Sequence, residues 1–241
     1  MKKIAVANYK GGVGKTTISL LLAIALSKKY KVLAIDLDMQ ANLSLSCINE
    51  KQIEHIALDI FTNGKIEPIK TKFSFDIIPS DLELSKVDMF LSNYKDKDKK
   101  LQKALENIIK YDYVIIDTPP TLNIATINAF TAADIIVIPV QTQPLALIGI
   151  KHIIDVLQEI SQHNNKSFKI IIAPNQYEKT ISLQTEALKE LESLISLDNV
   201  KIINPIPKRS ILQYLFVKDY TTIKFDTETL EALKMLLKEV I

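Results

Sequence analysis

The sequence predicts a doubly wound α/β fold, with a mostly parallel sheet flanked by helices, and three observations predict it. Short apolar runs rich in Val and Ile alternate along the chain with longer segments of helical spacing. The apolar runs are nearly unbroken, as in parallel strands that helices cover on both faces. A glycine-rich segment joins the first apolar run to the first helical segment. The 241 residues suit a single domain over 1–241.

Each element follows from its local pattern. Strands are expected at "KIAVAN" (3–8), "KVLAIDLD" (31–38), "FDIIPS" (75–80), "YDYVIIDTPP" (111–120), "ADIIVIPV" (133–140), "FKIIIAPN" (168–175) and "VKIINPIP" (200–207). Helical spacing predicts helices at 15–29, 98–110, 122–132, 145–163, 183–197 and 227–241. The last helix carries leucines along one face and mostly glutamates on the other, so we expect it to pack on the sheet and not to bind anionic lipid.

Composition excludes several kinds of site. The chain is 47% apolar and 24% charged, which is ordinary for a soluble globular protein, and its net charge of +2 says little about partners. Cys47 is the single cysteine, which excludes an intrachain disulfide and a cysteine-based zinc or iron–sulfur site. A single cysteine fits a reducing cytoplasm, and we find neither a secretory signal nor an apolar stretch long enough for a membrane helix.

The segment "KGGVGKTT" (10–17) lies between a predicted strand and a predicted helix, as a phosphate-binding loop requires. Glycines allow backbone N–H groups to approach phosphate oxygens, Lys15 would reach the β- and γ-phosphates, and the Thr16 hydroxyl would ligate Mg²⁺. The usual pattern G-x-x-x-x-G-K-[ST] would place a glycine at Tyr9. Lys10 follows Tyr9 instead, so this nucleotide site has a second positive charge.

Carboxylates follow two of the predicted strands. Asp36 and Asp38 end the strand "KVLAIDLD", and Asp117 ends "YVIID", at the carboxyl edge where ligands bind in such sheets. Asp117 has the position of a Walker-B carboxylate, which holds Mg²⁺ through the water shell of the ion. Asp36 has two interpretations: it orients the loop or the magnesium waters, or it caps the next turn.

These motifs resemble the ParA/MinD family of deviant Walker-A ATPases. "KGGVGKTT" is similar to the family's phosphate loop, "DLDMQAN" to its first switch "DLDPQGN", and "DTPPTLNIATINAFTAAD" to "DCPPSLGLLTLNALTAAD". "PVQTQPLALIGI" resembles "PVQCEYYALEGL", with Gln143 and Ile148 in place of acidic residues. The resemblance runs from Lys2 to about Gln213 and is closest to the small ParA or Soj type, which lacks an N-terminal helix-turn-helix domain. It implies a P-loop NTPase fold.

The resemblance implies ATP and Mg²⁺ as cofactors and assigns roles to the site residues. Lys10 would cross a dimer interface to the nucleotide of the other subunit, and Asp38 would position the attacking water and touch magnesium through water. The residues implied in catalysis are thus Lys10, Lys15 and Asp38. Those implied in metal binding are Thr16, Asp38 and Asp117. The implied nucleotide contacts are Lys10, Gly11, Gly12, Val13, Gly14, Lys15, Thr16 and Thr17, with Asn175, Pro205, Ile206 and Pro207 near the adenine.

The same resemblance implies partners. These are a second copy in the ATP state, non-specific double-stranded DNA, and a ParB-type protein that stimulates an otherwise slow hydrolysis during plasmid or chromosome partitioning. DNA contacts are expected from Lys208, Arg209, Lys218 and Lys224, of which Arg209 is the single arginine of the chain. We therefore expect a cytoplasmic, nucleoid-associated protein and no membrane partner.

Two other classes stay open at this point. One is a MinD-like or cargo-positioning ATPase that acts on a membrane or a protein cargo. The other is a metabolic relative: a nitrogenase-type iron protein, which needs two cysteines per subunit where this chain has Cys47 alone, or a biotin-pathway ligase. ATP-dependent binding to mixed-sequence DNA discriminates the partition ATPase from both.

Overall fold

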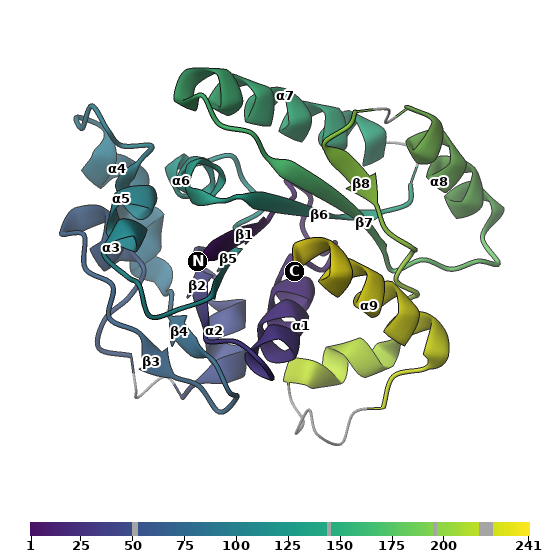
Figure 1. The fold of residues 1–241 in the computed structure, drawn as a ribbon, viewed down its shortest axis with the longest axis horizontal. Coiled ribbons are helices and arrows are strands. Elements are labelled where there is room, and N and C mark those ends of the chain that lie inside the picture. Colours follow the sequence, from purple (N-terminus) through teal and green to yellow (C-terminus); the bar gives the residue numbers. More distant parts are fainter. Residues whose placement is uncertain (50–52, 144–145, 195–196, 217–223) are drawn as a thin grey trace.

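The computed structural model describes residues 1–49, 53–143, 146–194, 197–216 and 224–241. Its strands form one eight-stranded sheet in the order β3-β4-β2-β5-β1-β6-β7-β8 (Figure 1). The strands are β1 Lys2–Val6, β2 Val32–Asp36, β3 Ile69–Lys70, β4 Asp76–Ile78, β5 Tyr113–Asp117, β6 Ile135–Gln141, β7 Lys169–Asn175 and β8 Val200–Ile202. All neighbours pair in parallel except β3 and β4. The predicted fold class is confirmed.

Helices cover both faces of the sheet, each over its own apolar core. One face carries α1 Lys15–Ser27, α2 Asn42–Cys47, η3 Ser210–Phe216 and α9 Thr227–Val240. The other carries α3 Leu58–Thr62, η2 Leu82–Lys86, α4 Val87–Leu91, α5 Lys100–Glu106, α6 Ile124–Ala132, α7 Ala146–Asn164 and α8 Ser182–Leu194. Figure 1 shows α1 and α9 on one side of the central strands and α6 and α7 on the other. Burial on both faces explains the unbroken Val and Ile runs.

The structure differs from the predicted elements where segments are short. Strand β3 and the helices α2, α3 and α4 were not predicted. Two to six residues are too few for the hydrophobic period of a helix or of a strand to be recognised. Strand β8 ends at Ile202, before the predicted end at position 207. Pro205 and Pro207 have no N–H to donate to a neighbouring strand, and each restricts the backbone conformation of the residue before it. The chain therefore leaves the sheet earlier than predicted.

The C-terminal helix packs as expected. Asp226 caps α9 by accepting a hydrogen bond from the Thr229 N–H (3.0 Å), and Ala232, Leu236 and Val240 are buried. This face contacts α1 and β7. In the part of the chain that the structure describes, every helix is too short or too polar to span a bilayer.

Candidate functional site

The glycine loop connects β1 to α1 at the carboxyl edge of the sheet. It borders a cavity of about 660 Å³ that Gly11, Gly12, Gly14, Lys15, Thr16 and Thr17 line from one side and Asp38, Gln40, Asn42 and Pro120 from others. Helix α1 begins after Gly14 without a side-chain cap. Its first N–H groups therefore face the cavity with the positive end of the helix dipole, an arrangement that favours an anion. Val13, in contrast, is buried and anchors the loop.

Gly14 is required by both backbone conformation and space. Its φ is 98°, in the left-handed region, and a Cβ built there would lie 2.2 Å from Asn175 Nδ2. The same Nδ2 donates a hydrogen bond to the Val13 carbonyl (2.8 Å), and Asn175 is buried at the end of β7. Asn175 therefore holds the loop against the sheet in this structure.

Gly14→Ala should lower the free energy of unfolding by about 2 kcal/mol or more, because the methyl group adds steric overlap to an unfavourable φ. Urea unfolding without nucleotide measures this. Gly11→Ala is the matched control, since its Cβ meets nothing within 4 Å and its φ lies outside the left-handed region. Equal stability of the two variants would contradict this account of the loop.

Two lysines of the loop have different surroundings. Lys15 is buried, and its Nζ lies 3.3 Å from the Lys10 carbonyl oxygen. Burial lowers the pKa of Lys15, while the carboxylates of Asp117 and Asp38 oppose that shift. Lys10 is exposed, and its Nζ donates to Gln143 Oε1 (2.6 Å). The ammonium group of Lys15 thus contacts the backbone of its own loop, whereas that of Lys10 lies at the surface.

Asp36 and Asp117 are register partners on β2 and β5, and both are buried. Asp36 accepts hydrogen bonds from the Ser44 N–H (2.9 Å), the Ser44 hydroxyl (2.7 Å) and the Asp38 N–H (3.1 Å). These bonds tie the first switch to the start of α2, so Asp36 orients and caps the turn. Asp38 lines the cavity, and its Oδ1 accepts from the Gln40 N–H (3.0 Å).

Asp117 has one satisfied and one unsatisfied oxygen. Oδ1 accepts a hydrogen bond from the Ser19 hydroxyl (2.8 Å), whereas Oδ2 is buried with no hydrogen-bond partner. Burial raises the pKa of Asp117, and the nearby Asp36 carboxyl raises it further. A buried carboxylate oxygen without a donor fits the water shell of a divalent cation. Asp117, Thr16 and Asp38 carry oxygen atoms of the kind that Mg²⁺ prefers, and their role as its ligands stays a prediction.

Without metal, Asp117→Asn should raise the free energy of unfolding at pH 8 by an amount on the order of 2 kcal/mol. The buried carboxyl of the wild type ionises at this pH, which is costly, whereas the amide of the variant stays neutral. The folded-state pKa is raised, so the folded protein binds more protons than the unfolded chain above about pH 4. Wild-type stability must then fall as pH rises toward the raised pKa. Thermal unfolding between pH 5 and 9 in EDTA tests this, and a variant with the wild-type pH slope would contradict it. Asp36, whose pKa burial also raises, contributes a residual slope in both proteins.

The residues predicted near the adenine are not among those that line the cavity, although Asn175 contacts the loop from behind. Ile206 is buried in the core, its N–H donates to the Pro174 carbonyl (2.7 Å), and its carbonyl accepts from the Tyr177 N–H (3.1 Å). Pro207 bridges to Tyr177. The loop from Pro205 to Pro207 is thus fixed beside the end of β7, and its adenine contact stays a prediction, as does that of Asn175.

Two of the four basic residues predicted to bind DNA, Lys208 and Arg209, have acidic partners within the chain. Lys208 Nζ lies 2.9 Å from Glu178 Oε1, and Arg209 contacts Asp226 (2.9 Å) and Glu228 (3.1 Å) at the start of α9. Lys224 borders a different, apolar cavity between α1 and α9. Lys218 lies outside the described residues.

Sequence reasoning missed several residues of the site. Ser19 lies one turn after the loop, Ser44 supports Asp36, and Gln176 Nε2 donates to the Gly12 carbonyl (2.7 Å). A hydroxyl on the buried face of an otherwise apolar helix, as at Ser19 in "KTTISLLLAIAL", is a signal that could have been noticed. The sequence around Gln176 carries no comparable signal. Its left-handed backbone conformation, with φ of 56°, and its place beside the loop depend on the tertiary fold.

Comparisons with known proteins find relatives that cover most of the chain. A family model described as an AAA domain matches residues 1–170. Soj, the sporulation initiation inhibitor protein of Bacillus subtilis, is 38% identical over 176 residues, which is 70% of each chain.

Solved structures match over nearly the whole chain. Apo McdA from Cyanothece has a TM-score of 0.90 at 21% identity and covers 100% of both chains, which shows the shared fold. A putative plasmid partition protein from Borrelia burgdorferi, bound to AMPPNP, has a TM-score of 0.74 at 26% identity, covering 99% of this chain and 95% of that one. The chain belongs to the ParA/MinD family of P-loop ATPases.

Proposed function

We propose that this protein is a Mg²⁺-dependent ATPase that dimerises around two ATP molecules and binds DNA non-specifically in that state. A ParB-type partner then stimulates hydrolysis, the dimer separates, and the cycle drives plasmid or chromosome partitioning. The sequence match to Soj, at 38% identity, supports this class over a metabolic ligase. The protein would be cytoplasmic and associated with the nucleoid.

One observation carries the proposal: the loop has two lysines that point to different places. Lys15 is buried against its own loop, whereas Lys10 is exposed, and within the described part of the chain its ammonium group donates only to Gln143, which is also exposed. An exposed hydrogen bond is weak, so Lys10 can exchange Gln143 for a new partner at low cost. A second subunit that faces the loop would present that partner as the phosphates of its nucleotide.

The residues around the cavity divide the work of phosphoryl transfer. Lys15 and the N–H groups at the start of α1 hold phosphate oxygens, and Thr16 and Asp117 would hold Mg²⁺, which neutralises charge on the phosphates when bound. Asp38 lines the cavity and would orient the attacking water. Lys10 from the other subunit would stabilise the charge that develops on the transferred group.

DNA binding must compete with ion pairs inside the chain. Lys208 and Arg209 pair with carboxylates at positions where both partners are more than a third exposed. Exposed ion pairs contribute about 0–1 kcal/mol, so phosphate groups can replace Glu178, Asp226 and Glu228. This exchange would make DNA binding modest per subunit and dependent on a dimer that presents each basic group twice.

The test is binding to mixed-sequence duplex DNA without nucleotide, with ADP, and with ATP and Mg²⁺, over a salt series. Asp38→Ala should hold the ATP state for the measurement. We expect salt-sensitive binding with ATP alone, weakened in a Lys208→Ala/Arg209→Ala variant together with a smaller salt slope. Lys103→Ala, which breaks a similar exposed pair with Asp96, is the control.

Two results would contradict the DNA proposal. The first is binding that does not depend on nucleotide, which would indicate ordinary surface charge. The second is no DNA binding by a protein that binds ATP normally. In the second case, nucleotide-dependent binding to anionic lipid vesicles would support the MinD-like alternative instead.

A further inference from the structure

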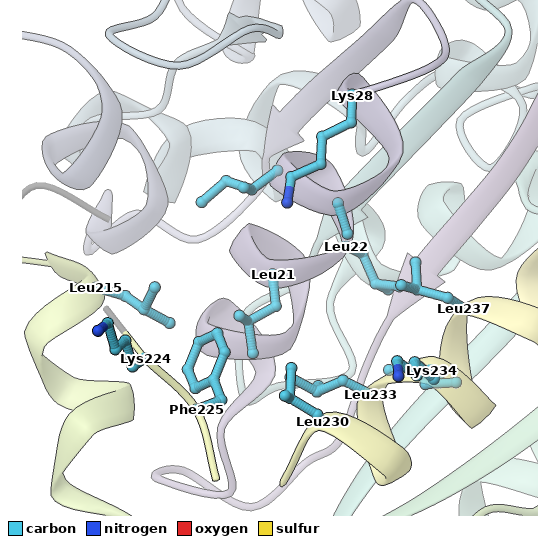
Figure 2. Close-up of a pocket in the computed structure, with 13 residues that line it drawn as sticks. Leu21, Leu22, Lys28, Leu215, Lys224, Phe225, Leu230, Leu233, Lys234 and Leu237 are labelled. Atoms are coloured by element: carbon cyan, nitrogen blue, oxygen red, sulfur yellow. The ribbon is translucent and has the colours of Figure 1, made fainter. Parts of the chain in front are cut away.

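A second cavity lies between α1 and α9, away from the phosphate loop. Its volume is about 770 Å³, within the range of roughly 300–1,000 Å³ typical of small-molecule sites. Leucines of α1 and α9 face each other across it, and Leu215 and Phe225 close one end (Figure 2). We call this cavity the α1–α9 groove.

The apolar walls of the groove are only partly covered. Leu22 and Leu236 line the groove and are buried, but Leu233 and Leu237 are half-buried and Leu230 is 39% exposed. Helix α9 therefore uses one part of its apolar face to pack on the sheet and leaves another part open beside α1. Apolar surface of this kind favours a ligand with a hydrocarbon body.

The polar side chains along the groove are cationic. Lys28, Lys224 and Lys234 line it and are exposed, and Figure 2 shows Lys28 and Lys224 on different sides of the leucines. Among the described residues that line the groove, none is acidic, and none of the ammonium groups of these three lysines has an ion pair or hydrogen bond to another described residue. Their positive charges are therefore available to a ligand.

We propose that the α1–α9 groove binds a single-chain anionic amphiphile, namely a long-chain fatty acid anion. Its hydrocarbon chain would lie between the leucines of the two helices, and its carboxylate would meet a lysine at the rim. Ligands such as sugars or nucleosides need several hydrogen-bonding groups, which a lining of leucines and lysines does not provide. A cationic amphiphile would be repelled. A flat bilayer surface would not fill a recess between two helices.

Calorimetric titration of the nucleotide-free full chain with dodecanoate tests the proposal. We expect saturable binding that strengthens about fourfold for each added methylene from octanoate to dodecanoate, as burial of a CH₂ group predicts. Dodecanol should bind more weakly than dodecanoate, and dodecyltrimethylammonium more weakly still, because the lysines favour a negative head group.

Variants locate the site. Leu230→Glu places a charge at the exposed edge of the apolar wall and should weaken dodecanoate binding at least tenfold, and Lys234→Glu should weaken it about fivefold. The matched controls are Leu183→Glu and Lys189→Glu on α8, both exposed and remote from the groove. All four positions are exposed, so the variants should fold, as circular dichroism can verify.

Three results would overturn the proposal. These are absence of dodecanoate binding, binding that is unchanged in Leu230→Glu, and equal losses in the α8 controls. Binding of anionic lipid vesicles or of an acidic amphipathic peptide that depends on Leu230, without dodecanoate binding, would assign the groove to a membrane or a partner protein and would also overturn it.

Discussion

Lys15→Ala should lose ATP affinity by about a hundredfold or more, while its fold remains intact. The ammonium group of Lys15 is buried beside the loop, near the carboxyl groups of Asp117 and Asp38. Removing one partner of a buried charge pair costs about 2–5 kcal/mol, which is roughly thirty- to several-thousand-fold in affinity. The loss should appear in binding of a fluorescent ATP analogue at low protein concentration.

The stability of the variant separates this explanation from misfolding. Burial lowers the pKa of Lys15, so the buried charge is costly to the nucleotide-free protein, and Lys15→Ala should melt no lower than wild type without nucleotide. Lys29→Ala changes an exposed lysine at the far end of α1 and should bind ATP normally. Unchanged ATP affinity in Lys15→Ala would refute the assignment of the phosphate loop.

The order of elements could be predicted because both faces of the sheet are buried. Strands such as β2 and β5 must then be apolar throughout, and the helices between them keep a clear period. Short elements carry no such signal. Strand β3 pairs antiparallel at the edge through two residues, and α3 has five, so their position depends on contacts that form only in the folded chain.

The site could be predicted as far as its motifs reach. The loop and the strand-end carboxylates are defined by local sequence, and the structure brings Lys15, Asp38 and Thr16 to one cavity. The supporting residues come from distant parts of the chain. Asn175 contacts the loop across 162 positions and Ser19 contacts Asp117 across 98, so only the packed sheet places them.

The ion pairs of Lys208 and Arg209 show a related limit. Their positive charges are evident in the sequence, but the availability of a charge depends on its neighbours in space. Asp226 serves both as the cap of α9 and as the partner of Arg209. The hydrogen bond from the Thr229 N–H lowers the pKa of Asp226 most, and the bond from Arg209 lowers it further, to about 2. That carboxylate stays charged at every physiological pH, so DNA binding as proposed would have to displace it from Arg209.

Lys10→Ala should bind ATP nearly as well as wild type and yet lose turnover by about a thousandfold or more. Lys15 and the backbone N–H groups, which we propose to hold the nucleotide of the same subunit, remain in place in this variant. A cation supplied by a second subunit at the moment of phosphoryl transfer is worth about 10³–10⁵ in rate. Gln143→Ala is the matched control, because it removes the hydrogen-bond partner of Lys10 but keeps the ammonium group. Phosphate release at saturating ATP measures both variants.

Mixing two inactive variants then decides in which subunit Lys10 acts. In a dimer of Lys10→Ala with Asp38→Ala, the site that keeps Asp38 receives an intact Lys10 only if that lysine comes from the opposite subunit. Activity should therefore return on mixing. If equal amounts of the two variants pair at random, half of the dimers contain one copy of each, and one of the two sites in such a dimer is complete. About a quarter of the wild-type activity is then expected. If Lys10 served its own nucleotide, no site in the mixture would be complete, and the mixture would stay as inactive as its components.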